Sequence, residues 1–317
     1  MDYIHSSVMP QEVLQYLGLA ERGGIVVDAT LGEGGHSELF LQSNPHIRII
    51  GLDADPVILE RARTRLAPFD SRVTLHHVWF DEFFARYEQA ERPDRILFDL
   101  GISMFHYRLS GRGFTFQGEE PLDMRLGGGA DVTARDILAS YSETELADLI
   151  YQFGEERYSR RIARRIVEMR KERPLTTVGE LAEVVSRAVP PAYRHGRIHP
   201  ATRTFQALRI AVNDELGRLR RALAGAYRVL APGGRMGVIS FHSLEDRIVK
   251  YFFREKKNLS ISQAEAPITR VGEESAGARI LTKKPLVPTE EEARANPASR
   301  SAKFRVCEKI EPEDGPV

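Results

Sequence analysis

The sequence predicts an α/β fold, a doubly wound parallel sheet interrupted by an inserted all-helical domain. Three observations predict it. Strand-like apolar segments alternate with helix-length segments up to about residue 101, a glycine-rich stretch and several helical segments then break this alternation, and strand signals return toward residue 309. We therefore expect a core formed by residues 1–108 and 206–317 and an inserted helical domain at 109–205 that recognises the substrate.

The first part of the chain reads as repeated strand and helix units. Runs rich in Val and Ile predict buried parallel strands, and the segments between them predict crossover helices. The strands are expected at 25–30, 47–52, 73–77 and 95–98, and the helices from 37 to 41 onward and at 56–66.

The middle of the chain is different. Residues 110–130 contain six glycines and few apolar residues, which favours a long ordered loop or a domain crossing. Helical segments follow at 131–139, 142–153, 157–171 and 177–188, and one long helix is expected at 205–230 because apolar residues recur there every three or four positions. A strand at 235–240, a helix at 244–253 and a closing hairpin of 280–287 with 302–309 complete the prediction.

Composition excludes several classes of protein. Lys plus Arg and Asp plus Glu both number 45, so a polyanionic partner must be bound by a local patch rather than by the field of the whole protein. A single cysteine, Cys307, rules out an internal disulfide framework and a multi-cysteine zinc site. No apolar run approaches the roughly 18 residues of a membrane span. We expect a cytoplasmic protein with no membrane and no metal; the sequence is compatible with a homodimer.

The glycine turn between the first strand and the first helix indicates a ligand site. Gly32, Gly34 and Gly35 lie where ligands of open α/β sheets bind, and Asp53 ends the next strand 19 residues after Gly34. This interval matches the acidic residue that accepts ribose hydroxyls in nucleotide-type cofactor sites. Glycines alone can serve only a tight turn, but the combination favours a nucleoside cofactor.

Two residues bear on which cofactor it is. A dinucleotide fingerprint starting at Gly32 requires glycine where Ser37 stands, which disfavours a nicotinamide-dependent oxidoreductase. Asp28 at the end of the first strand would repel a pyrophosphate but favour a cationic amino-acid group, unless it merely organises the turn. S-adenosylmethionine, which carries a sulfonium, an ammonium and a ribose but no phosphate, fits better.

At this point the sequence resembles a known family, the ribosomal RNA small subunit methyltransferase H family. The resemblance runs from about residue 5 to 309 and is carried by HSSVM at 5–9, DATLGEGGHS at 28–37, DLGIS at 99–103, PLDMR at 121–125, HPATRTFQ at 199–206 and SFHSLEDR at 240–247. It implies a class I S-adenosylmethionine-dependent methyltransferase core and methylation of N4 of a decoding-site cytosine in 16S ribosomal RNA, within the small ribosomal subunit.

The resemblance also implies the cofactor contacts. Phe80 covers the adenine, although a core aromatic beside Trp79 is an alternative, and His36 is otherwise only a helix-start residue. His106 stands where the family usually has a glutamine, and this departure keeps open an RNA-binding ribosome-assembly factor without methyl transfer. The expected cofactor-binding set is Gly34, Gly35, His36, Asp53, Phe80, Asp99 and His106.

The chemistry requires positioning more than activation, because a sulfonium methyl group is already reactive. The cytosine amine is a poor nucleophile, and Asp99 is the candidate acceptor for its protons. His242 is the second catalytic candidate, with a helix cap as its alternative because Ser243 precedes a helix. Phe114 or Phe116 could stack on the base, or anchor the glycine-rich loop.

The RNA must be held by local positive charge. The helix expected at 157–171 places Ile162, Ile166 and Met169 on one side and arginines on the other, although such a face is often merely solvated. A second basic cluster lies near residues 194–203, where phosphate contacts are more plausible than base readout. The expected RNA contacts are Arg125, Arg157, Arg160, Arg164, Arg197 and Arg203.

Overall fold

The computed structural model describes residues 7–116, 118–127, 131–196, 198–265 and 277–310. Its internal contacts divide the chain into two compact units, which are treated separately below. The core unit comprises Met1–Gly101 with Leu216–Val317, and the helical unit comprises Ile102–Glu215. The segment 109–205 expected as an insertion lies inside the helical unit, which extends beyond it at both ends.

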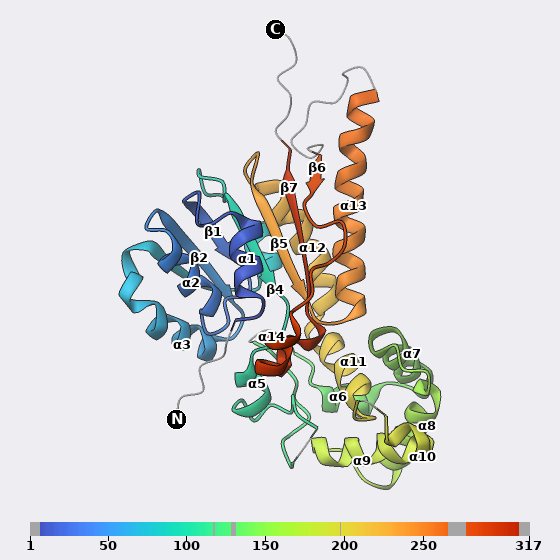
Figure 1. The fold of residues 1–317 in the computed structure, drawn as a ribbon. Helices are drawn as coiled ribbons and strands as arrows, with labels where there is room; N and C mark the ends of the chain where they lie inside the picture. Colours follow the sequence, from blue (N-terminus) through green and yellow to red (C-terminus); the bar gives the residue numbers. More distant parts are fainter. Residues whose placement is uncertain (1–6, 117, 128–130, 197, 266–276, 311–317) are drawn as a thin grey trace. The chain divides into compact units, whose positions relative to one another are not determined.

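A seven-stranded sheet organises the core unit, in the order β3-β2-β1-β4-β5-β7-β6 (Figure 1). The first five strands are parallel, and β7 runs antiparallel to both β5 and β6. The predicted α/β fold is therefore confirmed. Of the predicted hairpin, 303–309 is a strand, but its partner is the short 278–280 rather than 280–287, where only Leu286 forms an isolated bridge to Phe304. The strands are β1 Gly24–Asp28, β2 Ile47–Asp53, β3 Val73–His77, β4 Arg95–Asp99, β5 Arg235–Ser240, β6 Ala278–Ile280 and β7 Lys303–Lys309.

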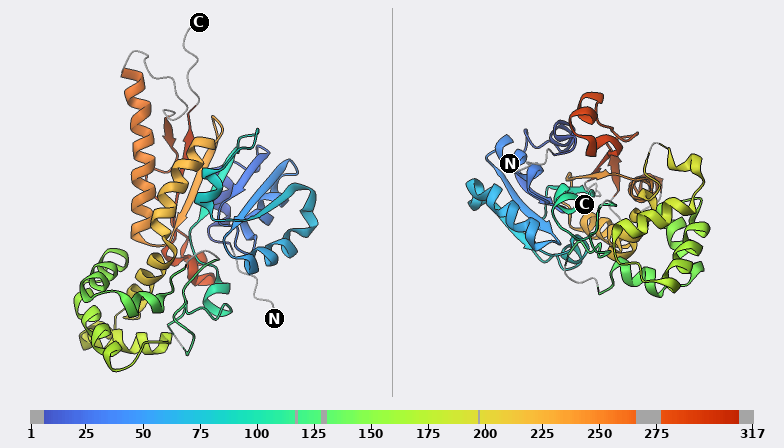
Figure 2. Two further views of the ribbon diagram at one scale, coloured as in Figure 1. Left: turned by 180° about the vertical axis from the view of Figure 1, so that it is seen from behind. Right: turned by 90° about the horizontal axis from the view of Figure 1, so that it is seen from below.

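Helices cover both faces of this sheet, because alternate strand residues are apolar on each side. On one face Val26, Ile49 and Leu97 pack against helices α1, α2 and α3. On the other face the neighbouring residues pack against α4, α12 and α13 (Figure 2). The helices of the core unit are α1 Pro10–Leu17, α2 Gly35–Ser43, α3 Pro56–Leu66, α4 Phe80–Ala85, α12 Glu215–Val229, α13 Ser243–Glu265 and α14 Glu290–Ala295.

Four of these helices differ from the prediction, because α4 and α14, like α1, were not predicted and α13 is longer than expected. Helix α13 continues twelve residues beyond the expected end at 253, although its second half lacks a strong apolar pattern. Helix α1 was not predicted; it buries Val13 and Leu17 and ends at Gly18, whose φ of 65° suits a left-handed helix cap. No helix among the described ranges is long and apolar enough to span a membrane.

The helical unit has its own core. Three of its helices begin with a capping box, in which Thr133, Ser142 or Thr177 bonds with the acid three residues later. Apolar side chains of α6 to α9 and α11 pack together with Phe114, Leu122 and Met124 of the glycine-rich segment. The helices are α5 Met104–Arg108, α6 Ala134–Ser140, α7 Glu143–Gly154, α8 Ser159–Glu172, α9 Val178–Ala188, α10 Pro191–Arg194 and α11 Thr202–Asn213.

The prediction of a single long helix at 205–230 was wrong. The chain breaks at Asp214, which has a left-handed conformation with φ of 48°, so α11 ends at Asn213 and α12 begins at Glu215. Aspartate tolerates this conformation better than most residues. Arg209 also bridges the break, since its guanidinium donates to both carboxylate oxygens of Glu215 at 2.7 and 2.9 Å.

The order of the parallel strands determines where a ligand binds. Strand β1 lies between β2 and β4. From β1 the chain adds β2 and β3 on one side, and it then crosses back to add β4 and β5 on the other side. In open α/β sheets this reversal opens a crevice beyond the carboxyl ends of the strands. Asp28, Asp53 and Asp99 are the last residues of β1, β2 and β4, and they therefore meet at this edge.

Candidate cofactor site and substrate-binding residues

The glycine turn after β1 leaves room for a ligand. Gly32 and Gly34 both have positive φ angles, 54° and 80°, which glycine adopts without strain. A Cβ built on Gly32 would meet no atom within 4 Å, so this part of the backbone faces open space. Gly34 is the N-cap of α2, and the free amides of the first turn lie next to it.

Asp53 is held in place by backbone donors. The Gly32 N–H donates to its Oδ2 at 2.9 Å, and the Asp55 N–H donates to its Oδ1 at 2.8 Å. Each carboxylate oxygen can accept a further bond, because an ionised carboxylate has about four acceptor positions. The residue expected to bind a ribose is thus fixed beside the glycine turn, with capacity for two hydroxyl groups.

Asp28 is an almost fully buried carboxylate. The Ser37 hydroxyl donates to its Oδ2 at 2.8 Å, while Oδ1 is buried and makes no hydrogen bond within the described chain. Burial raises the pKa of Asp28 to about 6, and nearby Asp99 adds to the increase, whereas His36 and Ser37 lower it. At neutral pH this position therefore holds a buried negative charge that a cationic group would stabilise.

Asp99 lies at the end of β4 with His36 beside it. The Nε2 atom of His36 is 3.5 Å from Oδ2 of Asp99, and the Asp99 N–H donates to the Thr30 hydroxyl at 2.6 Å. Its other oxygen, Oδ1, has no hydrogen-bond partner among the described residues. His36 is thus a close neighbour of Asp99 without a hydrogen bond to it, and Oδ1 of Asp99 is left to accept a proton donor.

Phe80 begins helix α4, after the end of β3. Its ring meets Phe98 edge-on at 5.8 Å and Trp79 at 6.4 Å, and it remains partly exposed. Phe80 therefore contributes to the core and keeps an accessible surface. Both interpretations offered for it from the sequence are compatible with this geometry, and the adenine contact stays a prediction.

His242 caps helix α13. The Glu245 N–H donates to His242 Nδ1 at 3.4 Å, and the Glu245 carboxylate in turn accepts from the backbone N–H of Phe241 at 2.8 Å. The other ring nitrogen of His242 lies 3.2 Å from the same carboxylate. These bonds favour the capping alternative over the catalytic one, and contact with the base stays a prediction.

The helical unit contains His106 and the two loop aromatics. His106 is buried, with its ring 5.2 Å from that of Phe114, which explains both as packing partners. Phe116 stacks almost parallel on His199 at 4.4 Å and meets Phe205 edge-on. Phe114 thus anchors the glycine-rich loop, while Phe116 is only partly buried. The cofactor contact of His106 stays a prediction.

The predicted RNA-binding arginines differ in how they are held. Arg157 precedes α8 rather than lying on it, and its guanidinium stacks over the rings of Tyr158 and Tyr193. Arg164 lies 3.6 Å from Glu143, and Arg203 donates to the Glu155 carbonyl. Arg160 is exposed on α8, whereas Arg197 lies outside the described residues.

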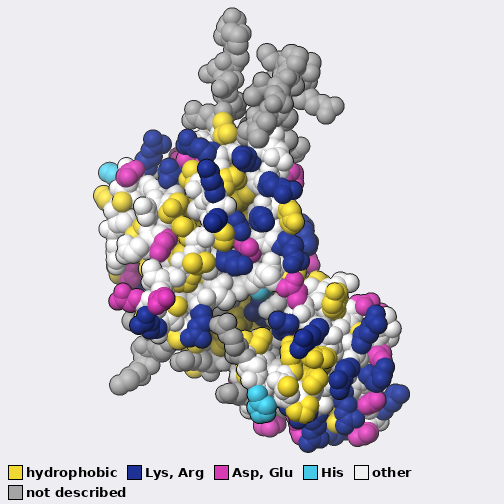
Figure 3. Space-filling model, turned by 45° about the vertical axis from the view of Figure 1, so that its right-hand side comes forward, with side chains coloured by type: hydrophobic (Ala, Val, Ile, Leu, Met, Phe, Trp, Pro, Cys, Tyr) yellow, Lys and Arg dark blue, Asp and Glu magenta, His cyan; other side chains and the backbone are white. Residues whose placement is uncertain are grey.

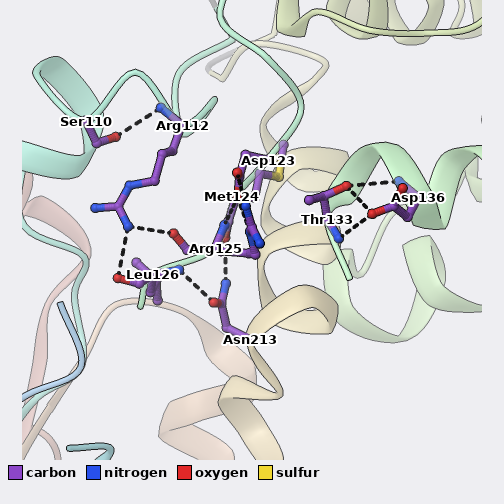
Figure 4. A network of polar contacts seen from close by, with 9 residues as sticks. All are labelled: Ser110, Arg112, Asp123, Met124, Arg125, Leu126, Thr133, Asp136 and Asn213. Carbon is purple, nitrogen blue, oxygen red and sulfur yellow. Dashed lines mark hydrogen bonds and ion pairs between the residues drawn. The ribbon is translucent and has the colours of Figure 1, made fainter. Parts of the chain in front are cut away.

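Arg125 belongs to a tightly bonded turn (Figure 4). Its guanidinium donates to both oxygens of Asp123 at 2.8 and 2.7 Å, which fixes the plane of the group. The residue between them, Met124, is buried with an unusual φ of 62°, and its carbonyl accepts from Asn213 at 2.8 Å. Such a strained residue persists only where several bonds determine it.

Sequence reasoning missed two supporting residues. Thr30 fixes the backbone of Asp99, and Ser37 bonds Asp28 besides breaking the dinucleotide fingerprint. Both are hydroxyl residues that follow a strand-end acid closely in the sequence. For Ser37 this closeness to Asp28, the acid that it bonds, is the signal that would have identified it. Thr30 bonds Asp99, which is 69 residues away, and no local signal marks that link.

The sheet order and the acid-lined strand edge define the class. Five parallel strands followed by an antiparallel β7, with a glycine turn after β1 and acids closing β1, β2 and β4, are the class I S-adenosylmethionine-dependent methyltransferase fold. The helical unit is the insertion in that fold. The buried carboxylate of Asp28 and the partly buried ones of Asp53 and Asp99 fit a cationic, phosphate-free cofactor.

Comparison with known proteins places the chain more narrowly. A family model described as the MraW methylase family matches residues 2–310, and the chain belongs to this family. It is 53% identical over 312 residues to a ribosomal RNA small subunit methyltransferase H from Treponema denticola, with 98% of this chain and 99% of that protein covered. A protein of the same name from Synechococcus elongatus is 48% identical over 310 residues, with 98% and 96% covered. The alternative of a nicotinamide-dependent oxidoreductase is thereby wrong.

Proposed function

We propose that this protein transfers the methyl group of S-adenosylmethionine to N4 of a cytosine in the decoding site of 16S ribosomal RNA. Its substrate is the small ribosomal subunit, and it therefore works in the cytoplasm. The observation that carries the proposal is the edge formed by Asp28, Asp53 and Asp99, whose three acids suit a cationic nucleoside cofactor. Full-length relatives named as ribosomal RNA methyltransferases support the substrate class.

The strand edge offers one group for each part of the cofactor. Asp53 is oriented to accept hydrogen bonds from two ribose hydroxyls, and the partly exposed face of Phe80 suits the adenine. Asp28 carries a buried charge with one unbonded oxygen, which the cationic amino-acid portion would stabilise. Gly32 faces open space and allows the cofactor to approach the backbone closely, whereas Gly34 and Gly35 leave room for Leu66 and Ser7 behind the turn.

The protein's own contribution to the reaction is placement. Bound S-adenosylmethionine supplies a methyl group that is already activated toward transfer. Asp99 is placed to accept a hydrogen bond from the cytosine amine through Oδ1, which draws that amine out of conjugation with the ring and fixes its direction of approach. The Thr30 hydroxyl fixes the backbone of Asp99, and His36 lies 3.5 Å from the other carboxylate oxygen.

The helical unit supplies substrate contacts in this proposal. Arg125, Arg157, Arg160, Arg164 and Arg203 present guanidinium groups, several of them held by acids, rings or carbonyls, and Arg197 belongs to the same basic segment. Fixed guanidinium groups suit phosphate oxygens. Selection of one cytosine then comes from the folded RNA in the small subunit rather than from base readout.

The test uses small ribosomal subunits from cells that lack the enzyme. Incubation of the purified protein with these subunits and methyl-labelled S-adenosylmethionine should label a single cytosine, and mass spectrometry of the digested RNA should identify N4-methylation. Label on a ring carbon or on ribosomal protein would show that the substrate assignment is wrong. Binding without any label would instead favour the assembly factor.

A further inference from the structure

Helix α13 of the core unit presents a stripe of positive charge to solvent. Four exposed cations, Arg247, Lys250, Arg254 and Lys257, follow one another at intervals of three or four residues. With 3.6 residues per turn they fall within an arc of about 80° and extend over roughly 15 Å. Figure 3 shows Lys and Arg side chains gathered over this side of the core unit.

The stripe differs from the charged faces of three other helices. On α3, α9 and α14 the exposed arginines pair with an acid one turn away on the same helix: Arg63 with Glu60, Arg187 with Glu183 and Arg294 with Glu290. Within the described ranges, Lys250, Arg254 and Lys257 form no ion pair. The exposed acid nearest to them along the helix is Glu255. It projects about 80° around the helix axis from Arg247, on the side away from the other three cations.

An aromatic ring lies beside the stripe, about 40° around the helix from Arg247. Tyr251 is 53% exposed, an unusual position for a large aromatic side chain, and the Arg254 guanidinium lies over its ring at 5.4 Å. Rows of cations with an exposed ring suit a nucleic-acid backbone and its bases, because cations bind phosphates and a ring stacks on any base.

The position of α13 connects the stripe to the cofactor site. The helix begins at Ser243, directly beyond the carboxyl end of β5, and β5 is parallel to β4. Its first turns therefore lie at the same edge of the sheet as Asp99, and Arg247 is just over one turn from the start. An RNA strand whose target base lies at that edge of the sheet can therefore extend along α13, with its phosphates next to the stripe.

We propose that this α13 stripe binds the RNA backbone flanking the target nucleotide, so that the core unit as well as the helical unit holds the substrate. This inference rests on the proposed function for the identity of the RNA. Four phosphate contacts give an affinity that falls steeply with salt concentration, since each neutralised phosphate releases a counterion.

The experiment compares two triple variants of the full chain. Lys250→Gln/Arg254→Gln/Lys257→Gln removes the stripe, and Arg48→Gln/Arg63→Gln/Arg86→Gln removes three exposed cations elsewhere on the core unit. Binding to unmethylated small subunits and to deproteinised 16S RNA is measured from 50 to 200 mM salt. The plot of log affinity against log salt should be shallower by roughly two to three for the stripe variant, since each contact adds about 0.7–0.9 to the slope.

That change in slope means the wild-type affinity falls roughly 20- to 40-fold more than the variant affinity across this range. The control variant should match the wild type, and all three should bind S-adenosylmethionine equally. Methylation by the stripe variant should show a raised KM with an unchanged kcat.

An unchanged slope in the stripe variant would overturn the proposal. So would a loss confined to whole subunits, because the partner would then be an acidic ribosomal protein. Failure of the proposed function has a separate signature: wild-type protein that binds the RNA but transfers no methyl group.

Discussion

Replacement of Asp28 by Asn should stabilise the ligand-free protein and weaken cofactor binding. The pKa of Asp28 rises from 3.8 to about 6, mainly because the carboxyl group is buried. Each pKa unit corresponds to about 1.4 kcal/mol, so the ionised carboxylate costs the folded state roughly 3 kcal/mol at neutral pH. Asparagine has the same shape and keeps an acceptor for the Ser37 hydroxyl, but carries no charge.

The pH dependence follows from the direction of the shift. The folded state binds the Asp28 proton more tightly than the unfolded state, so the free energy of unfolding falls as pH rises between about 4 and 6. The Asn variant lacks this loss. Its advantage over the wild type should be close to zero near pH 4 and reach about 3 kcal/mol above pH 7.

Urea unfolding followed by tryptophan fluorescence measures this difference, since Trp79 is the single tryptophan and belongs to the core unit. Asp246→Asn is the control of opposite sign: burial opposes its ionisation, but Arg305 and Lys303 lower its pKa, so its loss should destabilise at neutral pH. Calorimetry should show S-adenosylmethionine binding to Asp28→Asn roughly ten- to a hundredfold more weakly. Equal stability of Asp28→Asn and wild type at both pH 4 and pH 7 would refute the reasoning.

Three further variants test the remaining contacts. Asp99→Asn should lower kcat by about 10²- to 10⁴-fold with little change in cofactor affinity, as measured by methyl transfer to small subunits; a loss under tenfold would exclude it as the acceptor. Asp53→Asn should weaken S-adenosylmethionine and its demethylated product alike, by roughly ten- to a hundredfold in calorimetry, because both carry the ribose. Asn213→Ala removes bonds to Met124 and Leu126, worth about 2 kcal/mol, and should speed hydrogen exchange of the Leu126 amide roughly 30-fold; unchanged exchange would show that the turn holds itself.

The parallel strands could be predicted because they are short, continuous apolar runs. Strands 47–52, 73–77, 95–98 and 235–240 were predicted within a residue of β2, β3, β4 and β5. Both faces of these strands are covered, so nearly every position is apolar and the signal is dense. Helix boundaries were harder. The apolar spacing continues through Val212 and Leu216 without a gap, and nothing in that pattern marks the break at Asp214.

Site residues could be predicted only where a characteristic residue type occurs at the end of a predicted strand. Asp53 and the glycine turn were expected together, and the Gly32 N–H does donate to Asp53. The links made by Thr30 and His36 could not be derived, because they join residues that are distant in sequence and depend on the register of β1 against β4. Resemblance to a family supplied His36, and no local pattern did.

The balanced composition conceals where positive charge gathers on the surface. Equal numbers of acidic and basic residues indicated that a polyanionic partner must be bound by a local patch, and the arginines expected to form it all lie between residues 125 and 203. Among the described residues, however, five acids are buried, Asp28, Asp55, Asp81, Glu156 and Glu245, against three cations, Arg95, Arg305 and Lys309. Buried acids, which cap helices or line the cofactor edge, do not neutralise the positive charges on the surface. A chain with no net charge can therefore present an unbalanced stripe such as that of α13, and its salt dependence is the property that composition conceals.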